Sequence, residues 1–186
     1  MTEGDKVLCY VADLITRLIQ KDDFACRIDS DRFIFFTHTA GDALEVLTDK
    51  LLEGLTAYKL PFAIACNVGV YVTEDTSLSA VAMMDRAILA QSKIKGSYTV
   101  KCNYYTEEMR NNLLSEQEIS GIMEEAVEEE QFLVYYQPQY NHATGSLVGA
   151  EALVRWRHPE RGLISPGLFI PIFERNGFIT KLDLYV

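Results

Sequence analysis

The feature that most constrains the fold is the segment 147–156, in which every second residue is apolar and the charged residues fall only between them. Successive side chains of a strand point to opposite faces, and the even-numbered positions here are all apolar: Val148, Ala150, Ala152, Val154 and Trp156. The odd-numbered positions share the other face: Leu147, Gly149, Glu151, Leu153 and Arg155. The pattern predicts a strand that buries one face and carries Glu151 and Arg155 on the other.

Glu151 and Arg155 on this strand are too far apart to neutralise each other easily. Four residues of strand span roughly 13 Å at ~3.3 Å per residue, which is beyond the reach of an easy ion pair. Two charges without a local partner indicate an external ligand. The alternative is an edge strand whose charged face is simply solvated, and the alternation by itself leaves that open.

Other predicted elements surround this strand. Residues 132–140 predict a second strand, joined to the first by a turn at residues 141–145. Ser165 and Pro166 predict a helix start, since proline is tolerated in the first helical turn. Residues 107–130 are rich in glutamate and carry a narrow apolar stripe: Ile119, Ile122, Met123, Ala126 and Val127. Such a charge run is usually a solvated helix face, and here we predict a connecting helix that opens a second domain.

The first hundred residues predict a different order of elements. The predicted elements begin with a helix over residues 5–19 and a hairpin of strands 24–28 and 33–37 around the turn 29–32. A second helix follows from residue 44 and fades near 59–61, and a long strand covers 62–72. The last two are a helix over 79–95 that meets Gly96 and a closing strand over 98–104. The mixture of helices and strands predicts an α/β fold.

Composition argues against several classes of function. The 186 residues are 48% hydrophobic and 24% charged, as in ordinary globular proteins, and no apolar run approaches the ~18 residues that span a membrane. The net charge is −10 and the sequence contains no cluster of Lys or Arg residues, which argues against binding a nucleic acid polymer. The four cysteines are widely spaced and the three histidines form no metal motif. With no signal peptide at Met1, we expect a cytoplasmic protein with reduced thiols.

Four segments of the first half carry a family resemblance. They are Gly4-Asp5-Lys6-Val7-Leu8, Arg27-Ile28-Asp29-Ser30-Asp31-Arg32-Phe33, Asn67-Val68-Gly69 and residues 85–96. In this order and spacing they resemble the helix start, the RxGGDEF hairpin, the S-x-G strand and the following helix of the GGDEF (diguanylate cyclase) family. The resemblance covers about residues 4–104 and implies a palm-like α/β domain.

The departures from the GGDEF pattern fall on the hairpin. Asp29 and Ser30 stand where the family has two glycines, and their side chains obstruct the close approach of GTP to the backbone. Asp31 stands at the position of the family's metal-binding acid, but Arg32 replaces the glutamate that follows it in the family. The family's product-binding motif, RxxD, would lie at residues 20–23, where its arginine is missing. The chain also begins after the family's first strand, which carries another metal-binding aspartate. The resemblance therefore implies no cyclase activity; a plain structural turn and a weakened nucleotide-binding role both stay open.

Three motifs of the second half resemble another family. They are Tyr135-Tyr136-Gln137-Pro138, residues 149–156 and residues 165–171. They are similar to the YQP, EAL(L)RW and sPxxFIP motifs of the EAL family, which hydrolyses cyclic di-GMP with divalent metals in a modified (β/α)₈ barrel. The resemblance implies that Glu151 is a ligand of Mg²⁺ or Mn²⁺ and that Arg155 contacts a phosphate of the substrate. It also implies that Gln137 and Leu153 line the substrate pocket.

We therefore predict three parts: a degenerate GGDEF domain lacking its first strand (1–106), an acidic connecting helix (107–130), and the opening strands and helices of an incomplete EAL (β/α)₈ barrel (131–186). Two strands cannot close a barrel. We expect a cyclic di-GMP phosphodiesterase in the complete protein, and neither activity nor tight metal binding in this chain. Unpaired strand edges left by the missing strand predict self-association. The alternative is a non-catalytic module that binds cyclic di-GMP or GTP, or that dimerises.

Overall fold

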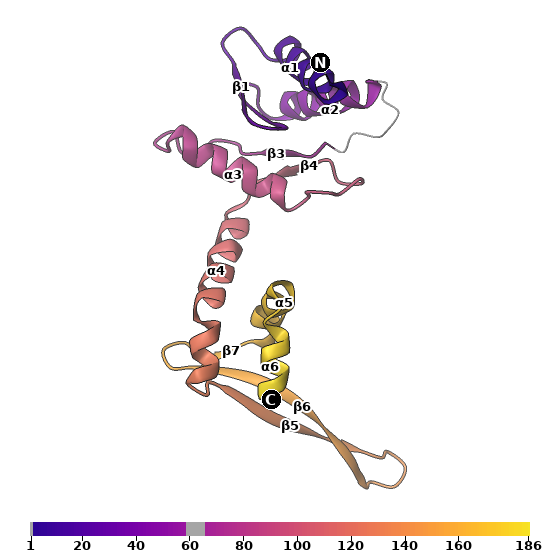
Figure 1. The fold of residues 1–186 in the computed structure, drawn as a ribbon, viewed down its shortest axis with the longest axis vertical. Helices are drawn as coiled ribbons and strands as arrows, with labels where there is room; N and C mark the ends of the chain where they lie inside the picture. Colours follow the sequence, from indigo (N-terminus) through magenta and orange to yellow (C-terminus); the bar gives the residue numbers. More distant parts are fainter. Residues whose placement is uncertain (1, 59–65) are drawn as a thin grey trace. The chain divides into compact units, whose positions relative to one another are not determined.

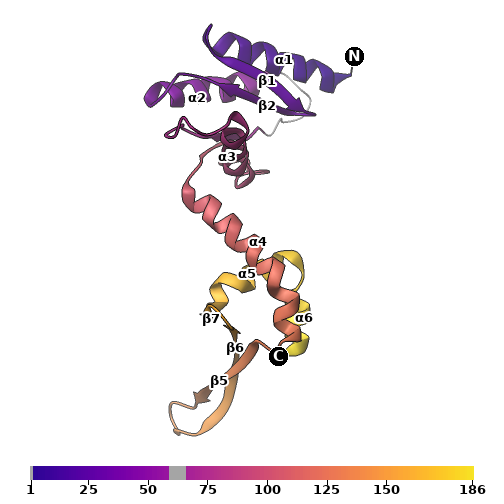
Figure 2. The same cartoon turned by 90° about the vertical axis from the view of Figure 1, so that its left-hand side faces the viewer.

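The computed structural model describes residues 2–58 and 66–186. The chain divides into two compact units, Met1–Arg110 and Asn111–Val186 (Figures 1 and 2). Its elements are α1 (Glu3–Leu18), β1 (Phe24–Asp29), β2 (Arg32–Phe36), α2 (Asp42–Ala57), β3 (Val68–Val70), α3 (Ala80–Ser92), β4 (Cys102–Tyr104), α4 (Glu107–Glu128), β5 (Phe132–Tyr140), β6 (Leu147–His158), β7 (Gly162–Ile164), α5 (Pro166–Asn176) and α6 (Ile179–Tyr185). The α/β fold class is confirmed, and no described sheet closes into a barrel. In the part of the chain that is described, no helix is long and apolar enough to cross a membrane.

In the first unit, α1 and α2 pack together and the strands pack against them. The helix α1 begins at a capping box, in which the Thr2 hydroxyl accepts from the Asp5 N–H (3.2 Å) and the Asp5 carboxylate accepts from the Thr2 N–H (2.8 Å). The Tyr10 hydroxyl donates to the Gly54 carbonyl (2.7 Å) and fastens α1 to α2. The buried core lies between these helices and the strands, and consists of Leu14, Ile15, Leu51 and Leu55.

The strands of the first unit form two separate sheets. The antiparallel pair is β1–β2, and the parallel pair is β3–β4. Among the described residues, neither β2 nor β3 has a second neighbour, so each strand keeps one unpaired edge. Gly69 of β3 lies so close to α3 that a Cβ would collide with the Ala87 carbonyl oxygen, which explains why glycine occupies this position.

Two elements of the first unit are shorter than predicted. The helix predicted to reach residue 95 ends at Ser92, whose hydroxyl donates to the Leu89 carbonyl (2.7 Å), and a turn follows. The closing strand begins at Cys102 rather than at residue 98, because the Asn67 side-chain amide donates hydrogen bonds to the Ser97 and Val100 carbonyls (both 3.1 Å). The predicted strand 62–72 is described only in part: β3 covers Val68–Val70, and residues 62–65 lie outside the described residues.

The second unit is a three-stranded antiparallel sheet, β5–β6–β7, covered by helices at one end. The predicted hairpin, connecting helix and helix start at Pro166 are all present, whereas β7 and α6 are additional. Three ion pairs link α4 to the rest of this unit: Glu116–Arg175, Glu118–Arg161 and Glu124–Lys181. They are solvent-exposed, so each contributes little to stability.

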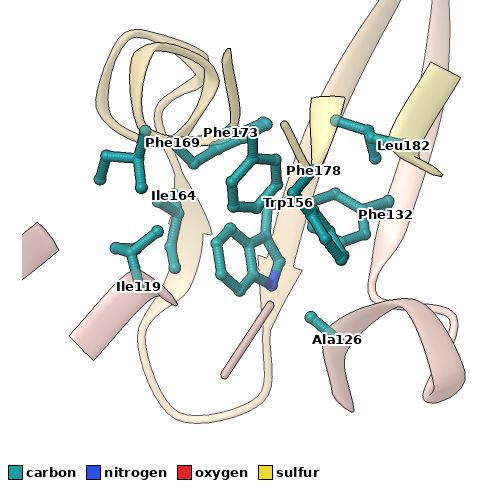
Figure 3. Packing of buried hydrophobic residues seen from close by; sticks show 10 residues of the cluster. Ile119, Ala126, Phe132, Trp156, Ile164, Phe169, Phe173, Phe178 and Leu182 are labelled. Carbon is teal, nitrogen blue, oxygen red and sulfur yellow. The ribbon is translucent and has the colours of Figure 1, made fainter. Parts of the chain in front are cut away.

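An aromatic core holds the second unit together. Trp156 is completely buried and lies at the middle of the cluster in Figure 3. The core residues are Ile119, Ala126, Phe132, Trp156, Ile164, Phe169, Ile172, Phe173, Phe178 and Leu182. Ile119 and Ala126 belong to the apolar stripe predicted for α4, so the stripe faces this core. The indole N–H of Trp156 donates to the Gln131 side-chain carbonyl (2.8 Å), which satisfies its one buried donor.

The apolar face predicted for β6 is buried at one end only. Trp156 is buried and Val154 is half-buried, but Val148 is 64% exposed. The predicted apolar face is therefore covered only over part of its length in the described residues. The reason is that the helices and β7 of this unit cover the Trp156 end, while the hairpin extends away from them (Figure 1).

The carboxylate of Asp23 ties the end of α1 to the end of β2. Its side chain is 1% exposed and accepts from the Gln20 N–H (2.8 Å), the Thr37 hydroxyl (2.9 Å) and the His38 N–H (3.0 Å). The hydrogen bond from the Gln20 backbone, together with those from His38 and Thr37, lowers the pKa of Asp23 to about 2. This stabilisation is complete above the ordinary pKa of 3.8 and is lost as the pH falls through about 2.

We expect Asp23→Ala to destabilise the first unit by about 2 kcal/mol at neutral pH, because the backbone donors lose a charged acceptor. The difference from the unaltered protein should shrink as the pH falls from 4 towards 2. Thermal unfolding over this pH range measures both effects. Asp22→Ala, at the exposed neighbouring position, is the control and should change little. Equal melting temperatures for the two variants would contradict this role for Asp23.

Candidate functional site

One face of the β5–β6 hairpin gathers the residues predicted for a ligand site. The register places Gln137 directly opposite Glu151, Tyr135 opposite Leu153 and Leu133 opposite Arg155. Directly opposed side chains lie on the same face of a sheet, with Cβ atoms about 4.5–5.5 Å apart. The structure therefore places Glu151, Gln137, Leu153 and Arg155 on one surface, as the sequence alternation predicted for the three residues of β6.

The polar groups of this face are largely free for a ligand. Glu151 and Gln137 are exposed, while Leu153 and Arg155 are half-buried. The Arg155 guanidinium donates to the Val154 carbonyl (2.8 Å), and the described residues show no ion pair to either Arg155 or Glu151. A guanidinium with several remaining donors on the same face as a free carboxylate suits a phosphate accompanied by a cation.

A divalent metal fits this donor set only in part. The Glu151 carboxylate and the Gln137 amide oxygen are hard ligands of the kind that Mg²⁺ prefers. Mg²⁺ and Mn²⁺ take about six oxygen ligands. Among the described residues, no group of three or more acidic, histidine or cysteine side chains could hold a metal. The face therefore supplies a part of a metal site.

The turn between β1 and β2 is a second candidate site, and its charges are paired internally. Arg32 donates through Nε to both oxygens of Asp29 (3.1 and 3.0 Å), and its Nη2 also bonds to Asp29. The Arg32 guanidinium lowers the pKa of Asp29 and has its own pKa raised in return. Arg27 donates to the backbone carbonyls of Asp29 (3.2 Å) and Ser30. The tip of the hairpin is thus closed by its own side chains.

Asp31 and Phe33 complete the predicted hairpin motif. The Asp31 side chain is exposed at the turn and is involved in no hydrogen bond or ion pair with the described residues. Phe33 packs against the core of the first unit and, with Arg27 and Asp5, also lines a pocket between α1 and the β1–β2 hairpin. The two candidate sites lie in different units of the chain.

Comparison with known families decides the assignment. The model of the diguanylate cyclase GGDEF domain matches residues 1–98, and that of the EAL domain matches residues 121–186. The chain belongs to the GGDEF–EAL family of cyclic di-GMP signalling proteins. The EAL match is partial, and it contains the whole β5–β6 face described above.

Curated relatives match the chain over nearly its full length. An uncharacterized Synechocystis protein, sll1895, is 32% identical over 98% of this chain and 27% of its own length. The cyclic di-GMP phosphodiesterase PdeR of Escherichia coli is 29% identical over 98% of this chain and 28% of its own length. The chain therefore spans about a quarter of the length of these relatives. Among solved structures, the GGDEF–EAL region of Vibrio cholerae LapD bound to c-di-GMP has a TM-score of 0.49 at 17% identity, covering 98% of this chain and 44% of that one.

Sequence reasoning missed two residues of the EAL face, Leu133 and Tyr135. The turn at residues 141–145 alone does not give these residues, because the register of β5 and β6 shifts by one residue between Gln139 and Tyr140. In the structure Asn141 closes this turn with its side-chain oxygen, which accepts from the N–H groups of Ala143 (2.9 Å) and Thr144 (3.1 Å). Beyond the register shift, Tyr135 lies opposite Leu153 and so among the predicted ligand residues.

Proposed function

We propose that the full-length protein hydrolyses cyclic di-GMP at its EAL domain and that its GGDEF domain acts without making cyclic di-GMP. The observation that carries the first part is the single face shared by Glu151, Gln137, Leu153 and Arg155. The naming of the Escherichia coli relative PdeR as a cyclic di-GMP phosphodiesterase supports the same reaction. We assign residues 1–106 to the GGDEF domain, 107–130 to the connecting helix and 131–186 to the EAL domain.

The side chains of the face have distinct roles in this proposal. Glu151 holds a Mg²⁺ or Mn²⁺ ion through its carboxylate, and Gln137 lies directly opposite to it. Arg155 donates to the phosphate that is to be cleaved and orients it, while Leu153 provides an apolar contact between these two charges. When bound, a divalent metal lowers the pKa of a water and neutralises charge on the phosphate. The remaining metal ligands come from outside the described face.

We predict that Glu151→Gln in the full-length protein abolishes hydrolysis of cyclic di-GMP and leaves the melting temperature unchanged. The glutamine removes the charge that holds the metal, while the exposed position makes no packing contribution. Chromatography of the linear product measures the activity, and chelation with EDTA should abolish it in the unaltered protein. Glu160→Gln, at an exposed position in the β6–β7 turn, is the control. Wild-type turnover by Glu151→Gln would show that Glu151 is not a metal ligand.

The GGDEF hairpin supports the second part of the proposal. A cyclase needs an acidic turn that holds metals against the phosphates of GTP. Here the Asp29 carboxylate is paired with Arg32, and Arg32 stands where the family has the glutamate that follows the metal-binding acid. Asp31 is left as a lone carboxylate at the tip, which is too few ligands for the metals of phosphoryl transfer.

We predict that the full-length protein forms no cyclic di-GMP from GTP with Mg²⁺ or Mn²⁺. Arg32→Glu should not create the activity, because the new carboxylate would face Asp29 and the two charges would repel. Chromatography of long incubations against a blank without protein measures the product. Synthesis by either protein would refute the assignment of an inactive GGDEF domain.

The unpaired edges of β2 and β3 favour a second candidate function, a dimerisation module. Exposed strand edges carry free backbone donors and acceptors that can pair with another chain. We predict that the protein associates at tens of micromolar in sedimentation experiments. Ile34→Lys in β2 should weaken association, since a charge at a strand edge opposes pairing. Val46→Lys on exposed α2 is the control, and a stable monomer at these concentrations would refute this function.

A further inference from the structure

Tyr135 lies among the ligand residues of the EAL face, although the motif segment that contains it assigns it no role. It is directly opposite Leu153, so its diagonal neighbours on β6 are Glu151 and Arg155. Diagonal neighbours in an antiparallel pair lie about 7–8 Å apart, within reach of an aromatic side chain. Along its own strand, Tyr135 shares the face with Gln137. The ring is therefore placed between the carboxylate and the guanidinium that we assign to the metal and the phosphate.

The environment of Tyr135 differs from that of the aromatic residues in the core of the unit. Phe132 and Trp156 are buried in the core, with ring centroids 5.0 Å apart. Tyr135 is 52% exposed, and within the described part of the chain its ring is paired with no other ring. A large ring that is open on a face of polar ligand groups is suited to a flat apolar partner.

We propose that Tyr135 is a positioning residue for cyclic di-GMP that stacks on one of its guanine bases. The inference rests on the function proposed above, because Arg155 and Glu151 are taken to hold the phosphate and the metal. A nucleotide fixed at its phosphate has a base beside that point, and the base needs an apolar surface after it leaves water. Stacking on an aromatic side chain supplies that surface, and Tyr135 is the exposed ring next to both charged residues.

Tyr136 is a matched control for this proposal. It is the next residue of β5, has the same side chain and is 70% exposed. Because successive residues of a strand point to opposite faces, Tyr136 lies opposite Ala152 on the other side of the hairpin. If binding depends on stacking, a substitution of Tyr135 should weaken it and a substitution of Tyr136 should not.

The test uses the full-length protein with cyclic di-GMP as substrate and compares Tyr135→Ala, Tyr135→Leu, Tyr135→Phe and Tyr136→Ala. Loss of one stacked base commonly weakens binding about tenfold or more. We expect KM to rise by about that factor in Tyr135→Ala and Tyr135→Leu, with little change in kcat. Tyr135→Phe keeps the ring and should stay within about twofold of the unaltered protein, as should Tyr136→Ala. Melting temperatures identify the variants that remain folded.

The outcomes separate this inference from the function on which it rests. If the unaltered protein neither hydrolyses nor binds cyclic di-GMP, the proposed function fails and the role of Tyr135 fails with it. If the unaltered protein is active and folded Tyr135→Leu has the same KM as Tyr136→Ala, only the stacking role is refuted. A lower melting temperature with unchanged KM in the Tyr135 variants would show a structural residue and would also refute it.

Discussion

The contact between Trp156 and Phe132 fixes the arrangement on which the EAL face depends. The two rings pack 5.0 Å apart at one end of the hairpin, and Gln131 holds the same end through the Trp156 indole (2.8 Å) and the Arg157 N–H (2.8 Å). A slip of the pairing by one residue would carry every side chain of β6 to the opposite face. Glu151 would then lie among the apolar residues. The buried end therefore determines which side chains a ligand meets.

In the first unit, charged groups at the hairpin are paired with local partners. Two of the departures from the GGDEF pattern at the hairpin, Asp29 and Arg32, bind each other, so each change compensates the charge of the other. Asp23 is similarly occupied, since its carboxylate accepts from Gln20, Thr37 and His38. These carboxylates serve the scaffold of the hairpin. The unit keeps the order of elements of its family while its acidic groups have local partners.

Periodicity predicted the elements well, and it predicted their environment less well. Alternation along β6 correctly separated Glu151 and Arg155 from the apolar face, because that separation depends only on strand geometry. It could not show that Val148 is exposed, because burial depends on how far the helices and β7 extend over the strand. The late start of the strand predicted at residues 98–104 has a similar cause. There the Asn67 side chain competes for backbone carbonyls, and no periodic pattern records such a contact.

The two faces of β6 have separate roles, since one packs against the core and the other carries the candidate ligand residues. The apolar face continues from Trp156 to Val148 and has no cover over its far part among the described residues. An exposed apolar strip of this kind gains free energy when further elements cover it. Covering it leaves the Glu151 face open, because the two sets of side chains point in opposite directions. Elements that add to the apolar side can therefore rigidify the strand that presents Glu151 and Arg155 without blocking the ligand, which separates the residues that hold the EAL domain together from those that would bind cyclic di-GMP.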